Sequence, residues 1–96
     1  MANALVSIQI IPKLNNTDDT FSYVDAAIEV IEEAKITYRV HPLETTMEGE
    51  LSELLRVIEK MNERMMEMGA VNVISQVKIV YQPEGIRMET LTEKYE

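Results

Sequence analysis

The chain has 96 residues, of which 46% are hydrophobic, and a formal net charge of −8. This length predicts a single domain spanning residues 1–96, and the ordinary hydrophobic content excludes an intrinsically disordered chain. Nucleic acids and anionic membrane surfaces are bound by clustered Lys and Arg, so the acidic balance argues against both as partners. It fits a small cationic ligand or another copy of the chain.

The chain contains no cysteine, which excludes a disulfide framework and fits a reducing compartment. We expect no signal peptide, because the first residues lack a basic segment followed by an apolar one. No apolar run approaches the roughly 20 residues needed to span a bilayer. A soluble, cytoplasmic protein is therefore expected.

The first part of the chain is predicted to form a strand and a helix. Residues 4–11 alternate in polarity and are rich in β-branched side chains, and Pro12 is expected to end this strand because proline lacks a backbone donor. A helix follows over about residues 20–34, with Asp19 or Thr20 as its N-cap. Its apolar stripe consists of Phe21, Val24, Ile28 and Ile31.

The middle of the chain predicts two more strands and a second helix. Residues 36–40 alternate again, and His41-Pro42 breaks the chain before a returning strand over residues 43–48. A helix opens at Gly49-Glu50 and ends at Gly69, which supplies a left-handed C-cap. Its apolar stripe consists of Leu51, Leu54, Leu55, Ile58, Met61, Met65 and Met68.

Residues 71–81 predict a fourth strand, followed by a turn at 83–85 and a tail with a short helix. One side of this strand carries Val71, Val73, Val77, Ile79 and Tyr81.

The predicted order is β-α-β-β-α-β, an α+β fold of the ferredoxin-like type, also called an alpha-beta plait. Right-handed crossovers place both helices on one face of a four-stranded antiparallel sheet and leave the other face open. Such a face can dock a second sheet, and the seam between them can hold a ligand. On the open face we expect Ser7, Gln9, Arg39, Glu44, Thr46, Glu48, Gln76 and Lys78, with Ile74 and Val80 adding apolar area.

The segment from Glu44 to Glu50 has an unusual density of carboxylates and hydroxyls. In a strand, Glu44, Thr46 and Glu48 would share one face, while Thr45 points to the other. Two carboxylates and a hydroxyl at one spot suit a small cationic ligand that forms hydrogen bonds. The alternative interpretation is a polar turn followed by a helix N-terminus.

Other chemistry has weaker support. His41 is the single histidine, and with Glu44 and Glu48 it would form a metal-assisted hydrolase site. No calcium-loop spacing and no glycine-rich phosphate loop is present, and Ser7 has only His41 as a conceivable base. We therefore expect no catalytic residues, no metal site and no enzymatic cofactor.

Three segments in chain order, residues 6–12, 23–28 and 42–50, resemble the small thiamine-binding protein family. The Glu-Thr-Thr-x-Glu-Gly-Glu run that begins at Glu44 is the most specific of the matches. The resemblance implies a cytoplasmic, non-enzymatic protein that binds thiamine or a related hydroxymethylpyrimidine. It also implies a homotetramer built as a dimer of dimers.

The resemblance also implies the residues that bind the ligand. Thiamine carries a permanent positive charge and an aminopyrimidine, so Glu44 and Glu48 would balance the charge and accept from the amino group. A homo-oligomeric structural or regulatory module without a small-molecule ligand remains the alternative. The expected ligand-binding set is Ser7, Gln9, Glu44, Thr45, Thr46 and Glu48.

Overall fold

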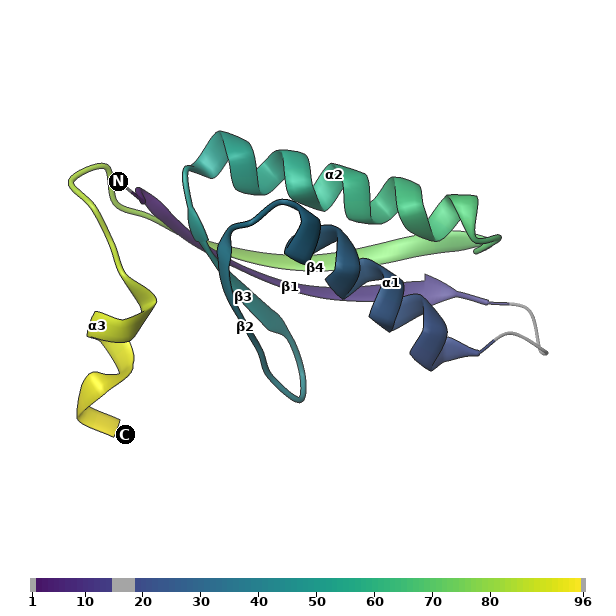
Figure 1. The fold of residues 1–96 in the computed structure, drawn as a ribbon, viewed down its shortest axis with the longest axis horizontal. Coiled ribbons are helices and arrows are strands. Elements are labelled where there is room, and N and C mark those ends of the chain that lie inside the picture. The colour runs from purple at the N-terminus through teal and green to yellow at the C-terminus, as the bar shows by residue number, and fades with distance from the viewer. Residues whose placement is uncertain (1, 15–18, 96) are drawn as a thin grey trace.

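The computed structural model describes residues 2–14 and 19–95, the side chain of Lys94 excepted. The predicted β-α-β-β-α-β order is confirmed, and four antiparallel strands form one sheet in the order β2-β3-β1-β4 (Figure 1). A 3-10 turn, Glu93–Tyr95, follows the last helix. The elements are β1 (Ala4–Lys13), α1 (Thr20–Glu33), β2 (Thr37–Val40), β3 (Thr45–Gly49), α2 (Leu51–Glu67), β4 (Asn72–Tyr81) and α3 (Met88–Thr92).

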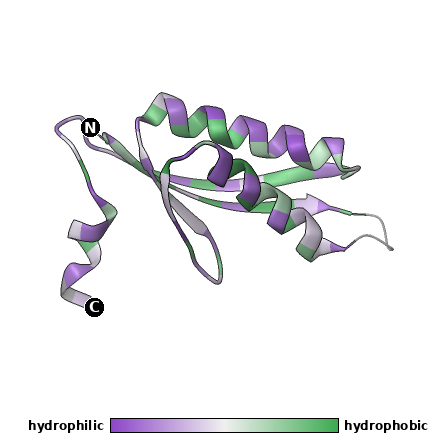
Figure 2. Ribbon diagram, viewed as in Figure 1, coloured by the Kyte–Doolittle hydropathy of each residue, from purple (hydrophilic) through white to green (hydrophobic). Residues whose placement is uncertain are grey.

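The core lies between the sheet and the helices α1 and α2, which pack on the same face as predicted. Hydrophobic and hydrophilic residues are interspersed along both helices (Figure 2). The buried residues of each helix pack into the core, so each helix turns one apolar face inward. No helix among the described residues is both long and apolar enough to cross a membrane. The largest fully buried side chains are Val6, Ile31, Met47, Leu54, Met61 and Met65.

The expectation that Pro12 ends the first strand is wrong, because β1 continues to Lys13. The Lys13 carbonyl accepts from Val71 N at 2.8 Å, so the backbone groups of Lys13 point toward β4. Neighbouring residues of a strand point their backbone groups to opposite sides, so the nitrogen of Pro12 faces the other edge. There β3 pairs with β1 only as far as Ile8, and the missing donor therefore breaks no ladder hydrogen bond.

The N-cap prediction for α1 is confirmed, since Asp19 accepts from Phe21 N at 2.9 Å. The predicted apolar stripe is wrong at Phe21, whose side chain is 80% exposed. The buried aromatic ring of this helix is Tyr23, whose hydroxyl donates to the Met68 carbonyl at 2.6 Å. The small side chains of Ala26 and Ala27 share the buried face and let the helix approach the sheet closely.

Strand β4 forms an edge of the sheet and leaves much apolar surface exposed. Among the described residues no strand pairs with its outer edge. Val77, Ile79 and Tyr81 share the helix-side face predicted for them, yet they are 37%, 47% and 56% exposed.

The face opposite the helices is not fully open in the monomer, which corrects the prediction. After a turn in which Gly85 adopts a φ of 117°, the chain folds back beside the N-terminus (Figure 1). Leu5, Ile86 and Met88 then form a second buried cluster at one end of this face. The C-terminal segment thereby covers the end near Glu48 and leaves the rest of the face uncovered.

Candidate functional site

Strand register arranges polar side chains of the open face in rows across the sheet. Arg39 of β2 lies opposite Thr46 of β3, Thr46 lies opposite Ser7 of β1, and Ser7 lies opposite Lys78 of β4. We call these four residues the basic row. Neighbouring strands lie about 4.8 Å apart, so two hydroxyls occupy the middle of the row and one cation lies at each end.

A second row lies beside the basic row. Gln9 of β1 is opposite Gln76 of β4. Thr45 pairs with Ile8, so the preceding residue, Glu44, follows on the β3 side of Gln9. Successive side chains on one face of a strand are about 6.7 Å apart, so the second row lies about this distance from the basic row. A small organic molecule can therefore contact both rows.

The second row and two members of the basic row, Ser7 and Lys78, lie around a hollow of about 260 Å³, here called the open-face hollow. It is lined by Ser7, Gln9, Leu43, Glu44, Gln76, Val77 and Lys78. It brings together three of the predicted ligand-binding residues, Ser7, Gln9 and Glu44. Glu44 precedes β3 in a tight turn, where the Glu44 carbonyl accepts from His41 N at 2.8 Å. This turn holds the carboxylate beside the end of the sheet.

The polar side chains of the open-face hollow have unused hydrogen-bonding capacity. Within residues 2–14 and 19–95, neither Glu44 nor Lys78 forms a salt bridge with another side chain. Across the same residues, the side chains of Ser7, Gln9 and Gln76 form no hydrogen bond with the protein. These groups are therefore available to form hydrogen bonds with a ligand.

The other three predicted residues have different surroundings. Thr46 is partly buried on the open face beside Ser7. Thr45 is 8% exposed and lines a separate hollow of about 190 Å³ between α1 and the turn before β3. The Glu48 carboxylate accepts from Met88 N at 2.7 Å, so it fastens the C-terminal segment to the sheet.

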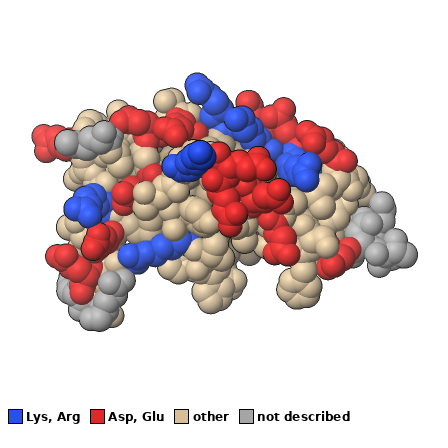
Figure 3. All heavy atoms as spheres, viewed as in Figure 1, with Lys and Arg blue, Asp and Glu red and all other residues tan. Residues whose placement is uncertain are grey.

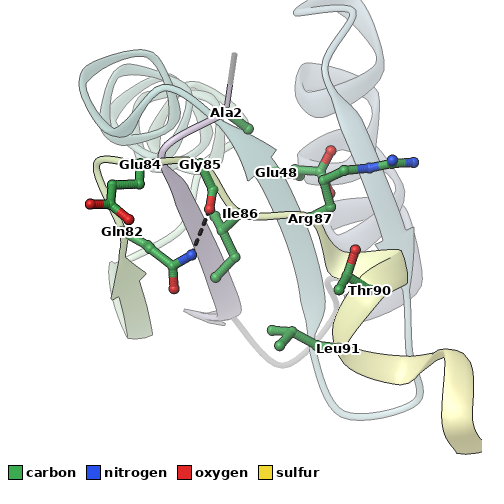
Figure 4. Close-up of a pocket in the computed structure, with 9 residues that line it drawn as sticks. All are labelled: Ala2, Glu48, Gln82, Glu84, Gly85, Ile86, Arg87, Thr90 and Leu91. Atoms are coloured by element: carbon green, nitrogen blue, oxygen red, sulfur yellow. Dashed lines mark hydrogen bonds between the residues drawn. The ribbon is translucent and has the colours of Figure 1, made fainter.

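The C-terminal segment and the sheet enclose a larger cavity, of about 530 Å³, which sequence reasoning missed. Figure 4 shows Glu48 and Thr90 on one side of it and Gln82, which donates to the Gly85 carbonyl at 2.6 Å, on the other. The apolar lining comes mainly from Ile86 and Leu91. The one sequence signal for this region was the short helix predicted in the tail, and that prediction did not place the tail against the sheet.

The residues considered for a metal-assisted hydrolase are not brought together. His41 and Glu44 both line the hollow of about 190 Å³ beside α1, whereas Glu48 binds the tail. In the part of the chain that the structure describes, no group of three or more His, Cys, Asp or Glu side chains is placed to hold a metal ion. Glu50 accepts from Asn3 Nδ2 at 2.7 Å at the start of α2.

Many of the charged side chains belong to the two long helices rather than to the open face. Figure 3 shows many acidic side chains, interspersed with basic ones, over the surface that carries α1 and α2. This distribution is typical of solvated helix faces. The net charge of −8 therefore says little about the hollow, where one carboxylate and one ammonium group lie at opposite sides.

The family of this chain follows from its similarity to known proteins. Residues 6–96 match the family described as thiamine-binding protein. The chain belongs to the thiamine-binding protein family. It is 41% identical over 90 residues to a UPF0045 protein of Clostridium perfringens, covering 94% of each chain, and 32% identical over 80 residues to a UPF0045 protein of Bacillus subtilis, covering 79% and 77%.

Solved structures agree with this family assignment. A domain of unknown function from Bacillus cereus has a TM-score of 0.91 at 35% identity, over 99% of this chain and 92% of that one. A Thermotoga maritima protein, provisionally assigned to thiamine biosynthesis or salvage, has a TM-score of 0.87 at 29% identity, over 98% and 99%. The predicted ferredoxin-like fold and the predicted family are both confirmed.

Proposed function

We propose that this protein binds thiamine or a related hydroxymethylpyrimidine in the open-face hollow, without catalysing a reaction. The proposal rests on one observation: Ser7, Gln9 and Glu44 lie in one hollow, and their side chains have no hydrogen-bond or salt-bridge partner in the part of the chain that the structure describes. Membership of the thiamine-binding protein family supports the ligand class. The Thermotoga relative, assigned provisionally to thiamine biosynthesis or salvage, supports it as well.

The chemistry of the hollow complements the ligand. The Glu44 carboxylate can balance a thiazolium charge or accept from the pyrimidine amino group, and such charge-assisted hydrogen bonds are the stronger kind. The Gln9 and Gln76 amides can each donate and accept, which matches the adjacent donors and acceptors of an aminopyrimidine. Ser7 and Thr46 add hydroxyls. Glu48 would reach the ligand only after giving up its bond to Met88 N.

We also propose that the protein assembles as a cytoplasmic homotetramer, a dimer of dimers, whose subunits close the hollow. At about 260 Å³ the hollow is slightly smaller than usual ligand sites of about 300–1,000 Å³, so a second subunit would complete it. An unpaired edge with exposed Ile79 and Tyr81 favours pairing of two β4 strands. Stacking of two open faces would then join the dimers.

The ligand proposal is tested by isothermal titration of thiamine and its pyrimidine half into wild type and Glu44→Ala. Loss of a partner for a buried polar group costs about 1–3 kcal/mol, so Glu44→Ala should weaken binding by about tenfold or more. Glu53→Ala, on the exposed surface of α2, is the matched control and should bind as wild type. Equal affinity of wild type and Glu44→Ala for every ligand would contradict the proposed site.

The assembly proposal is tested by native mass spectrometry. Ile79→Lys places a charge on the exposed apolar edge and should shift tetramers to smaller species. Phe21→Lys, at a position that is 80% exposed on α1, should leave the tetramer intact. A monomeric wild-type protein at micromolar concentration would contradict this assembly.

The apolar β4 edge also favours a second function, a structural or regulatory homo-oligomer without a small-molecule ligand. In that case the polar side chains of the open face would only contact one another across a subunit seam. Tetramers that show no thermal shift with thiamine, its phosphates or its pyrimidine half would support this function over ligand binding.

A further inference from the structure

We infer that the ligand of the open-face hollow carries an anionic group in addition to its organic cation, and that Lys78 selects this group. This inference rests on the proposed function and specifies its ligand class: a phosphate ester of a thiamine-type cation rather than the free vitamin. It starts from the basic row, which the family resemblance did not indicate as a whole. Of that row, only Ser7 and Thr46 were predicted to bind the ligand.

Lys78 has an unusual position for a site that would hold only a cation. Among the described residues that line the open-face hollow, it is the sole Lys or Arg. It forms no salt bridge there with Glu44, which lines the same hollow. An ammonium group facing a bare organic cation would repel it. The hollow therefore has an acidic side and a basic side, and a ligand with both charges satisfies both.

The hydroxyls of the basic row point to the chemistry of the anion. Ser7 is directly opposite Lys78, and Thr46 is directly opposite Ser7. Phosphate oxygens in proteins are bound by Lys and Arg together with Ser and Thr hydroxyls, and bonds to an ionised group are the stronger ones. The Ser7 hydroxyl and the Lys78 ammonium line the hollow from neighbouring strands about 4.8 Å apart, so they fit the oxygens of one phosphate group. Thr46 adds a hydroxyl on the next strand, beside Ser7.

Arg39 extends the same row on the other side of Thr46. Its Nη1 donates to Thr92 Oγ1 at 3.4 Å, so the C-terminal segment holds this guanidinium at the edge of the open face. It adds a second positive charge within about two strand spacings of Ser7. Glu44, Gln9 and Gln76 form the second row beside the basic row and would hold the pyrimidine or thiazolium part.

Isothermal titration of thiamine and thiamine monophosphate into wild type and Lys78→Gln tests this inference. We expect wild type to bind the monophosphate about tenfold more tightly than thiamine at low ionic strength, because one charge-assisted hydrogen bond contributes about that gain in affinity. Lys78→Gln should lose this preference while binding thiamine at least as well as wild type. Lys60→Gln, on the exposed surface of α2, should keep the preference. High salt should reduce the preference in wild type, because the hollow is open to solvent.

Two results would overturn the inference while leaving thiamine binding intact. One is equal affinity of wild type for thiamine and its monophosphate. The other is a preference for the monophosphate that Lys78→Gln retains. Absence of binding by either compound would overturn the inference together with the proposed function. Lys78 is exposed, so Lys78→Gln should melt at the wild-type temperature, and circular dichroism would verify that any lost preference is not caused by unfolding.

Discussion

Replacing Glu48 with alanine should loosen the C-terminal segment without unfolding the domain. The Glu48 carboxylate accepts from Met88 N at 2.7 Å in a partly buried setting. A hydrogen bond to a charged group contributes about 1.5–3 kcal/mol, so the free energy of opening at this point should fall by that amount. Since 1.4 kcal/mol is about tenfold in an equilibrium constant, the open population should rise about 10- to 100-fold.

The apolar contacts of the segment would remain in this variant. Ile86 and Met88 are 8% and 6% exposed beside Leu5, and full burial of one such side chain contributes about 1.5–3 kcal/mol. The segment should therefore stay docked most of the time, and the melting temperature of the domain should change little. The effect is local because the main core lies on the other face of the sheet.

Amide hydrogen exchange followed by nuclear magnetic resonance measures this opening directly. The Met88 amide should exchange about 10- to 100-fold faster in Glu48→Ala than in wild type. The matched control is Glu89→Ala, which removes an exposed ion pair with Arg87 at 2.8 Å. Such surface pairs contribute about 0–1 kcal/mol, so the control should change exchange by less than about fivefold. Equal Met88 exchange in wild type and Glu48→Ala would refute the anchoring role.

Three further predictions concern stability. Leu54→Ala should lower the free energy of unfolding by about 2–5 kcal/mol in urea denaturation, because Leu54 is fully buried. Leu43→Ala, at a position that is 78% exposed, should change this free energy little. Equal losses in the two variants would contradict the assigned core. Gly69→Ala should destabilise by about 1–2 kcal/mol because Gly69 has a φ of 104°, and an unchanged denaturation midpoint would refute the strain. Hydrogen bonds from Ser22 and from the Phe21 amide lower the pKa of Asp19 below its ordinary value of 3.8. The ionised Asp19 therefore stabilises the fold above that value, and this contribution is lost as the pH falls through the lowered pKa. Melting curves should show wild type more stable than Asp19→Asn at pH 6, with the difference shrinking below pH 3.8; a difference independent of pH would contradict the assignment.

Local patterns were sufficient to predict most of the elements. Alternation of apolar side chains identified the strands, and the spacing of three to four residues identified both long helices, because these periods follow directly from backbone geometry. Single residues also marked ends correctly: Asp19 caps α1, and Gly69 takes the left-handed conformation after α2. Phe21 was misplaced because helical spacing alone does not say which of two neighbouring apolar stripes meets the sheet.

The sequence by itself also determined which residues of each strand share a face, and so predicted the polar character of the open face. Only the tertiary structure decided which of these residues become neighbours across strands. Ser7 and Lys78 are far apart in the chain and meet through the register of β1 with β4. That register depends on hydrogen bonds and core packing summed over the whole sheet. The tertiary structure likewise directed Glu48 to the C-terminal segment, because chain reversal at Gly85 brings a backbone donor to that carboxylate.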